Sequence, residues 1–236
     1  MNKILRKNFK IIIIGKKDVF FEKIIIFLRK KKIRFIYRYL EKDSKKKELF
    51  NFLKTKNFDY LLSYRNPLIL DNKMLGLAKK LNVNFHPSPP RYRGVGGFNL
   101  AILNSDKEFG ATAHLMTSKV DGGLIIDMKS FKISKKINLD ELILKTRKLQ
   151  YLQVKKLLNQ IIDNNLNLEL IKNRNKKKSY KWSKKIFYLK DLEKLYKIDY
   201  KKIKKINIDK YLRSTLTENF RPEILVGNNS FVLKNE

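Results

Sequence analysis

The first third of the chain alternates short apolar runs with stretches of helical periodicity. Residues 9–15 form a β-branched run that ends in glycine, which is typical of a parallel strand covered on both faces. Further apolar runs predict three more strands, at 33–39, 60–64 and 83–85. Helical spacing between these runs predicts helices over 21–28, 44–53 and 74–81. This alternation predicts an α/β fold with a Rossmann-like, doubly wound, mostly parallel sheet, in which ligands bind at the carboxyl ends of the strands.

The pattern changes in the middle of the chain. Two strands are predicted at 112–116 and 124–131, joined by a turn at 119–123 that contains two glycines. Asn138, followed three residues later by Glu141, indicates a helix start, and one apolar face then continues to residue 161. We therefore expect a hairpin followed by a long helix.

The last quarter of the chain differs from the rest in its pattern of basic and aromatic residues. A basic loop is expected at 173–178, and aromatic residues alternate with lysines over 180–189. Apolar stretches on either side of Gly227-Asn228-Asn229 predict a terminal β-hairpin. We expect a main domain over residues 1–165 and a small, partly β appendage over 171–236.

Composition narrows the class of protein. A chain of 236 residues with 43% hydrophobic residues can bury a sizeable core, which excludes a disordered basic tail protein. With no cysteine and two histidines, we expect no disulfide, no cysteine nucleophile and no metal site. No apolar run approaches the roughly 20 residues of a membrane-spanning helix, so we expect a cytoplasmic protein without a membrane partner.

The net charge of +33 is the most conspicuous compositional feature. It suggests a polyanionic partner, because Lys and Arg that contact phosphates release counterions. However, Lys outnumbers Arg 44 to 11, and Lys, Ile and Asn, whose codons are rich in A and T, are all abundant. The charge also lies in two flanks, 1–81 and 129–236, whereas residues 82–128 carry four basic and four acidic side chains. The neutral stretch indicates where chemistry constrains the sequence.

A pair of polar residues ends the last predicted parallel strand inside this neutral stretch. Asn84 and His86 are two residues apart, so they share one face of the strand. Three prolines and three glycines follow, which stiffen the chain and permit close approach of a ligand to the backbone. An imidazole base beside an amide donor suits acyl transfer to an amine. Asp121, in the turn with two glycines, would supply a carboxylate that sets the charge of the imidazole or holds a water beside it.

These residues resemble the catalytic core of the folate-dependent formyltransferases. That family shares an Asn-x-His-Pro signature, present here at 84–87, a Pro/Gly loop, and a later Asp-x-Gly, present at 121–123. The match continues through 110–127, where His114 precedes the aspartate by seven residues.

The resemblance implies roles for three catalytic residues. Asn84 would hydrogen-bond the formyl oxygen, His86 would serve in proton transfer, and Asp121 would manage the proton through His86 or water. Residues 1–165 would then be the catalytic domain.

The resemblance also implies the formyl donor. N10-formyltetrahydrofolate would be the co-substrate, and no metal would be needed. Its pterin would be held by backbone groups after the third strand and beside Asp121. The residues concerned are Arg65, Asn66, Leu68, Val120 and Gly122.

The acceptor amine distinguishes three branches of this family. The enzyme acting on glycinamide ribonucleotide binds phosphate with a glycine and polar loop after the first strand, whereas residues 15–20 here have no second glycine, Ser or Thr. Methionyl-tRNA formyltransferase has a long C-terminal barrel, for which residues 171–236 are too few. The sugar N-formyltransferases resemble this chain in the compact loop at 89–96, in the strand at 110–116, and in Tyr211–Pro222 before the terminal hairpin.

We therefore expect a nucleoside-diphosphate-linked amino sugar, carried on dTDP or UDP, as the acceptor. The resemblance would place the product in lipopolysaccharide O-antigen biosynthesis. Glycinamide ribonucleotide and methionyl-tRNA remain alternatives. An RNA-binding module on a degenerate formyltransferase scaffold is the non-enzymatic alternative, although we do not expect a nucleic-acid partner.

The loop after His86 and the aromatic stretch supply the expected contacts to the acceptor. Cations would bind the diphosphate, and an aromatic ring would stack on the base. The candidates are Arg91, Tyr92, Arg93, Gly94, Gly96, Tyr180 and Trp182. The arginines are otherwise solvated loop charges, and the two late aromatic residues otherwise pack in the appendage. The edge of the terminal hairpin could pair with a second copy to form a homodimer.

Overall fold

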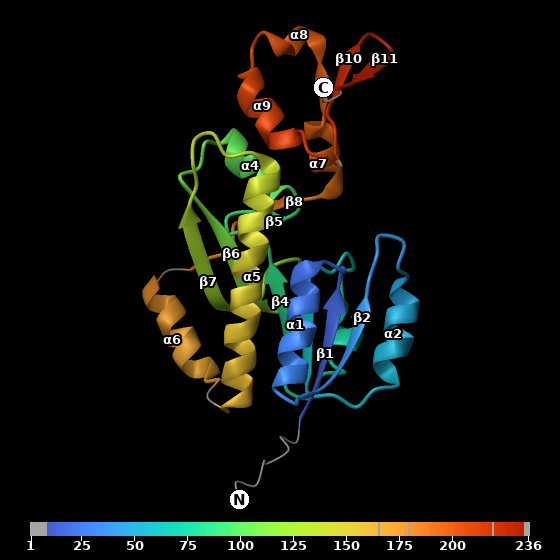
Figure 1. Ribbon diagram of the computed structural model, residues 1–236, viewed down its shortest axis with the longest axis vertical. Coiled ribbons are helices and arrows are strands. Elements are labelled where there is room, and N and C mark those ends of the chain that lie inside the picture. The colour runs from blue at the N-terminus through green and yellow to red at the C-terminus, as the bar shows by residue number, and fades with distance from the viewer. Residues whose placement is uncertain (1–8, 165, 179, 219, 234–236) are drawn as a thin grey trace, which may run out of the picture.

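The computed structural model describes residues 9–164, 166–178, 180–218 and 220–233. Its centre is a six-stranded sheet in the order β2-β1-β3-β4-β6-β7 (Figure 1). The strands are β1 (Lys10–Gly15), β2 (Arg34–Tyr39), β3 (Tyr60–Tyr64), β4 (Leu81–His86), β6 (Glu108–Leu115) and β7 (Ile125–Lys132). The first four pair in parallel, and β6 and β7 are antiparallel to their neighbours. The predicted Rossmann-like, mostly parallel sheet is confirmed.

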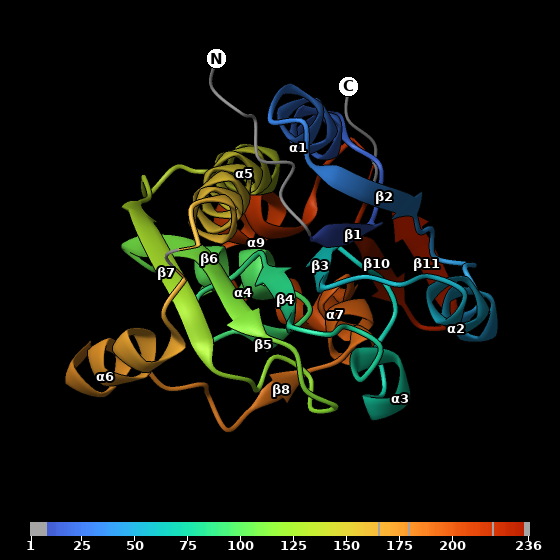
Figure 2. The same ribbon diagram turned by 90° about the horizontal axis from the view of Figure 1, so that it is seen from below.

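Helices cover both faces of this sheet. They are α1 (Val19–Lys30), α2 (Lys46–Lys54), α3 (Asn72–Leu75), α4 (Gly97–Leu103), α5 (Leu139–Ile162) and α6 (Leu168–Lys178). Ile11 and Ile13 belong to the core shared with α1 and α5, whereas Ile12 and Ile14 belong to the core shared with α2 and α3. Figure 2 shows α1 and α5 together on one side of the sheet. Because β1 is buried on both faces, its sequence is apolar at every position instead of alternating.

Most of the C-terminal region forms a small α/β unit at the top of Figure 1, and its first strand, β8 (Ile186–Phe187), lies lower, beside β5 (Arg93–Gly94). Its elements are β8 (Ile186–Phe187), α7 (Leu189–Leu195), β9 (Lys197–Asp199), α8 (Tyr200–Ile203), α9 (Ile208–Thr215), β10 (Glu223–Val226) and β11 (Asn229–Val232). The predicted terminal hairpin is confirmed, since β10 and β11 pair antiparallel, and β9 adds a third strand. Helix α9 packs on α4, where Asn99 donates a hydrogen bond to the carbonyl of Ser214.

The C-terminal region also pairs with the loop that follows β4. Strand β8 pairs in parallel with β5 (Arg93–Gly94), which follows the proline loop. The backbone N–H of Val95 also donates to the carbonyl of Phe187 at 3.0 Å. The two regions are therefore connected by backbone hydrogen bonds as well as by packing.

Two predicted elements were wrong. The helix expected at 74–81 is the single turn α3, because Asp71 caps it early by accepting from the N–H of Met74, while Leu81 already pairs with Tyr60 in the sheet. The basic loop expected at 173–178 is the end of α6. Ile171 anchors that helix in the main core, and the side chain of Asn175 donates to the carbonyl of Ile125. Within the described residues, none of the helices is both long and apolar enough to cross a membrane.

Candidate active site

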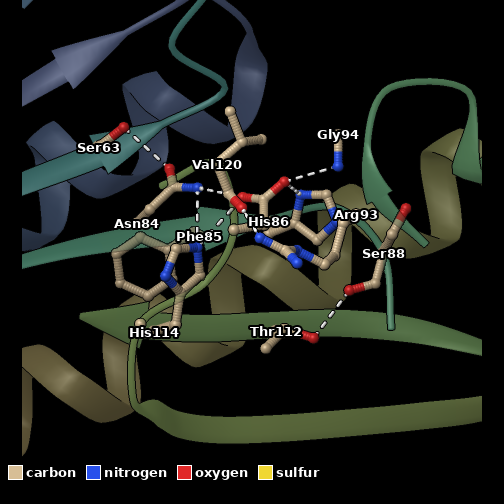
Figure 3. Close-up of polar contacts among 12 residues, drawn as sticks. Ser63, Asn84, Phe85, His86, Ser88, Arg93, Gly94, Thr112, His114 and Val120 are labelled. Carbon is tan, nitrogen blue, oxygen red and sulfur yellow. Dashed lines mark hydrogen bonds and ion pairs between the residues drawn. The ribbon is translucent and has the colours of Figure 1, made fainter. Parts of the chain in front are cut away.

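The carboxyl end of β4 presents two polar side chains on one face. Val83 and Phe85 pack in the core under α1 and α5, so Asn84 and His86 project on the opposite face. Ser63 is the register partner of Asn84 on β3, and its hydroxyl donates to Oδ1 of Asn84 at 2.9 Å (Figure 3). This bond directs the amide nitrogen of Asn84 towards the next strand, β6.

Asp121 is the common partner of the site. It lies in the loop between β6 and β7 with a left-handed backbone (φ 38°) and is 9% exposed. Its Oδ2 accepts from the N–H of Gly94 at 2.8 Å and lies 3.3 Å from Nδ1 of His86. Its Oδ1 lies 3.3 Å from Nε2 of His114 and 3.4 Å from Nδ2 of Asn84. The structure thus brings Asn84, His86 and Asp121 into contact.

The surroundings of Asp121 keep it ionised. Burial is the largest single influence and would raise its pKa, but the charge of the His86 imidazolium present in acid, the hydrogen bond and charge of protonated His114, and the N–H of Gly94 together outweigh burial. The pKa falls to about 2 as a result. Asp121 is therefore a fixed negative charge near neutral pH.

His86 has one ring nitrogen committed and one directed at Asp121. Nε2 lies 2.7 Å from the carbonyl of Tyr92, which assigns a proton to that nitrogen and leaves Nδ1 facing the carboxylate. Burial lowers the pKa of His86, and the charge of Asp121 opposes that effect only in part. The imidazole is a neutral base at Nδ1 whose protonated form would lie against a carboxylate.

Two members of the site were not among the predicted residues. His114 has Nδ1 2.8 Å from the carbonyl of Leu115, which leaves Nε2 to accept from Asn84 at 3.2 Å. The seven-residue spacing to Asp121 was its signal in the sequence. Ser63 has no such local signal, because its place beside Asn84 depends on the pairing of β3 with β4.

The residues expected to hold the pterin lie in two loops, one after β3 and one between β6 and β7. After β3, the side chain of Asn66 accepts from the N–H of Leu68 at 2.9 Å and donates to its carbonyl at 3.0 Å, which closes a turn. Arg65 precedes this turn in a left-handed conformation (φ 52°). Val120 and Gly122 flank Asp121.

The arginines and the tyrosine expected to bind the acceptor are engaged within the protein. Arg91 pairs with Asp106 at 2.7 Å. Tyr92 is buried, and its hydroxyl donates to the same carboxylate at 2.8 Å. Arg93 donates to the carbonyls of Val120 at 2.5 Å and Ser183 at 3.0 Å. Their side chains therefore shape the loop.

The remaining expected contacts differ in their surroundings. Gly94 and Gly96 both adopt positive φ, 83° and 78°, and the N–H of Gly94 reaches Asp121. Tyr180 lines a surface cavity beside α6. The indole of Trp182 lies against the imidazoles of His86 and His114.

Two arginines, Arg65 and Arg147, lie close to Asp18, which follows β1. Asp18 caps α1 by accepting from the N–H groups of Phe20 and Phe21, and Arg65 pairs with it at 2.5 Å. Burial lowers the pKa of Arg147, on α5, and the neighbouring charge of Arg65 lowers it further. Two guanidinium groups thus lie near the carboxylate of Asp18, and only Arg65 was among the predicted site residues.

Residues 14–162 match the model of the family described as formyl transferase. The match covers more than half of the chain and includes the whole Asn84, His86 and Asp121 cluster. The chain belongs to the formyl transferase family.

Individual relatives match different shares of the chain. A methionyl-tRNA formyltransferase from Mycoplasmopsis pulmonis is 32% identical over 102 residues, which are 43% of this chain and 35% of that protein. The chain thus matches about a third of the length of this relative. A sugar N-formyltransferase structure from Shewanella sp. FDAARGOS_354 has a TM-score of 0.72 and 16% identity, and the match covers 96% of this chain and 97% of that one.

An N-formyltransferase from Helicobacter canadensis, determined with folinic acid and dTDP-3-aminofucose, has a TM-score of 0.69 and 19% identity over 94% of this chain and 86% of that one. At these identities, the two structures demonstrate a shared fold.

Proposed function

We propose that this protein transfers the formyl group of N10-formyltetrahydrofolate to the amine of a nucleoside-diphosphate-linked amino sugar. The observation that carries the proposal is the convergence of Asn84, His86 and Asp121 at the carboxyl end of β4, where His86 and Asp121 are buried. In the reaction, the neutral amine attacks the formyl carbon, the bond from that carbon to N10 breaks, and the products are a formamide and tetrahydrofolate.

Asn84 would stabilise the charge that develops on the formyl oxygen. Its Nδ2 is held in place through Ser63 and makes long contacts of 3.2 Å to His114 and 3.4 Å to Asp121. Because both contacts are long, a formyl oxygen can replace either of them. Hydrogen bonds from catalytic groups are often long in the free enzyme and shorten when the substrate is bound. A positioned amide donor of this kind is typically worth about 10²- to 10³-fold in rate.

His86 and Asp121 would move the proton. The attacking amine must lose a proton, which passes by way of the Asp121 carboxylate to Nδ1 of His86. Asp121 then stabilises the imidazolium, and the same proton is returned to N10 as the folate leaves. The lowered pKa of His86, caused mainly by burial, favours the neutral form that can accept a proton.

The folate would occupy the loops on either side of this cluster. We assign the pterin to backbone groups of Arg65, Asn66 and Leu68 and to Val120 and Gly122. The turn closed by Asn66 supports this assignment, because it presents a preformed backbone edge just after β3, the strand that pairs with the strand of Asn84.

The acceptor is proposed from three observations. Likeness to sugar N-formyltransferase structures extends through the C-terminal region, whereas the methionyl-tRNA relative matches less than half of the chain. Arg65 and Arg147 offer a cationic site for a diphosphate. Asp18 fills the N-terminus of α1 with a carboxylate, which disfavours a phosphate there, as glycinamide ribonucleotide would require.

Among the other residues expected to bind the acceptor, Gly94, Gly96 and Tyr180 stay in the proposal as contacts. Arg91, Tyr92 and Arg93 are assigned to shaping the loop around His86, because their polar atoms bind Asp106, Val120 and Ser183.

A panel of acceptors tests the proposal. The purified protein is incubated with N10-formyltetrahydrofolate and, separately, dTDP- and UDP-linked amino sugars, glycinamide ribonucleotide and methionyl-tRNA. We expect a mass gain of one formyl group on an amino-sugar nucleotide, lost in Asp121→Asn and kept in Tyr200→Ala, whose side chain is exposed on α8. If folded protein formylates only one of the other acceptors, the substrate is reassigned. If it formylates none and instead binds RNA, the enzymatic proposal fails.

Three further parts of the proposal concern context. We propose a division into a catalytic domain at 1–165 and a C-terminal region at 171–236, a cytoplasmic location, and a role in O-antigen biosynthesis.

We also propose a homodimer. Strand β11 lies at the edge of its sheet with Phe231 and Val232 exposed, which supports pairing with a second copy. Light scattering of the protein and of Phe231→Lys tests that homodimer.

A further inference from the structure

The segment 180–187, here called the strap, runs from α6 to β8 (Figure 2). Its backbone is bonded to the loop that follows His86. The N–H of Ser183 donates to the carbonyl of Pro90 at 3.0 Å, and Ile186 and Phe187 pair with Arg93 and Gly94. The strap therefore belongs structurally to the catalytic loop, although it is distant in sequence.

Trp182 is the strap residue whose ring lies against both imidazoles of the site. Its ring centroid lies 5.0 Å from that of His114 and 6.0 Å from that of His86, with interplanar angles of 81° and 64°. Its indole N–H donates to the carbonyl of Gly123 at 2.7 Å. With this donor committed, the ring is held edge-to-face against the two imidazoles.

The bond to Gly123 matters because Gly123 lies two residues after the catalytic candidate Asp121, in the same loop. Asp121 has a left-handed φ of 38°, an uncommon conformation for a residue with a side chain, so its loop must be held from outside. Two side chains do this: Arg93 binds the carbonyl of Val120, just before Asp121, and Trp182 binds that of Gly123, two residues after it.

We propose that Trp182 is a positioning residue of the active site: it fixes the loop that carries Asp121 and keeps water away from His86 and His114. This role replaces the base-stacking role expected from the sequence. It gives the C-terminal region a direct part in the chemistry, because without the strap the two imidazoles lose one wall of their enclosure.

The groups around His86 indicate how its pKa should change when the indole of Trp182 is removed. Asp121 faces it from the β6–β7 loop, His114 from β6, and Arg93 from β5, and the carbonyl of Tyr92 binds its Nε2. Among these influences, burial is the largest and lowers the pKa of His86. Removing the indole admits water, so the pKa should rise towards the ordinary value of about 6.5.

The two histidines of the chain make a direct test possible, because each imidazole can be assigned by replacing the other. Histidine resonances are titrated by NMR in the wild type, Trp182→Ala, Trp182→Phe and the control Tyr200→Ala. In Trp182→Ala we expect the pKa of His86 to rise and the ring resonances of His114 to move, because an aromatic ring 5.0 Å away is lost. Tyr200→Ala should match the wild type. Trp182→Phe keeps a ring but loses the N–H, so the His86 titration should stay near that of the wild type.

The effect on rate rests on the proposed function and is measured separately. Trp182→Phe should lower kcat for formyl transfer about 10- to 100-fold with little change in the KM for folate, since small displacements of a catalytic group cost this much. An unchanged His86 titration in folded Trp182→Ala, or an unchanged kcat in Trp182→Phe, overturns the inference. If the wild type formylates no acceptor, the proposed function fails, while the titration still decides the role of Trp182.

Discussion

The hydroxyl of Ser63 donates to Oδ1 of Asn84 at 2.9 Å, and this one bond sets which end of the amide faces the reacting groups. With Oδ1 occupied, Nδ2 is directed at His114 (Figure 3). It also lies 3.4 Å from Oδ1 of Asp121. A residue on β3 thus determines the orientation of a donor on β4. An amide turned the other way would present an acceptor to the formyl oxygen and repel it.

Replacing Ser63 with Ala should therefore lower kcat about fivefold, which corresponds to the roughly 1 kcal/mol of one hydrogen bond. Replacing Asn84 with Ala should cost about 10²- to 10³-fold. Steady-state formyl transfer measures both, and Ser230→Ala, an exposed change on β11, is the matched control. If Ser63→Ala is as fast as the control, the bond from Ser63 does not orient the amide.

Asp121 should make stability depend on pH in the acid range. Its pKa falls from 3.8 to about 2 in the folded protein, so its stabilising effect is fully present above pH 3.8 and is lost as the pH falls towards 2. The shift corresponds to about 2 kcal/mol. Urea unfolding between pH 5 and 2 should show this loss in the wild type and not in Asp121→Asn. The exposed change Asp43→Asn should behave as the wild type, and an equal acid loss in Asp121→Asn would refute the assignment.

His86 should determine the acid limb of the pH–rate profile. The neutral imidazole accepts the proton, and burial lowers its pKa below 6.5, so kcat/KM should stay high from pH 8 down through pH 6.5 and fall only at lower pH. His86→Gln should lose about 10²- to 10⁴-fold in rate and should also lose this limb. A limb centred above pH 6.5 would show that another group controls the reaction.

Two glycines with positive φ provide a matched test of the loop. At Gly94 (φ 83°) an added Cβ would meet the carbonyl oxygen of Phe187 at 2.0 Å, whereas at Gly227 (φ 59°) it would meet nothing within 4 Å. Gly227→Ala should cost about 1 kcal/mol of unfolding free energy, the usual penalty for a left-handed alanine. Gly94→Ala should cost clearly more and should also reduce formyl transfer, because the N–H of Gly94 binds Asp121. Urea unfolding and activity are compared, and equal costs would contradict the close packing of β5 on β8.

Arg147 should act on acceptor binding alone. If it holds a diphosphate, Arg147→Gln should raise the KM for the sugar nucleotide about tenfold or more, since a hydrogen bond to a charged group contributes roughly 1.5–3 kcal/mol. The KM for folate should not change. Lys148→Gln, the exposed neighbour on the same helix, is the control. Equal effects of the two changes would indicate a general loss of positive charge.

Much of the fold could be predicted from local patterns. A strand alternates its side chains with a period of two, so the shared face of Asn84 and His86 followed from the sequence alone. The uniform burial of β1 and the turn at Gly227 were readable for similar local reasons. Helix α6 was not, because residues 173–178 are all Lys, Arg or Asn and conceal a helix whose stability comes from the packing of Ile171 and the contact of Asn175 with β7.

The sequence by itself determined the class of sheet, the residues that carry the chemistry and their formyltransferase signature, because these depend on neighbours along the chain. Only the tertiary structure decided which residues orient them. Ser63 is 21 residues from Asn84, and Trp182 is 68 residues from His114. Those contacts depend on which strands pair and where the strap crosses, and backbone hydrogen bonding and burial over the whole chain decide both. For the same reason, Arg91 and Tyr92, which lie beside the catalytic motif in sequence, bind Asp106 instead.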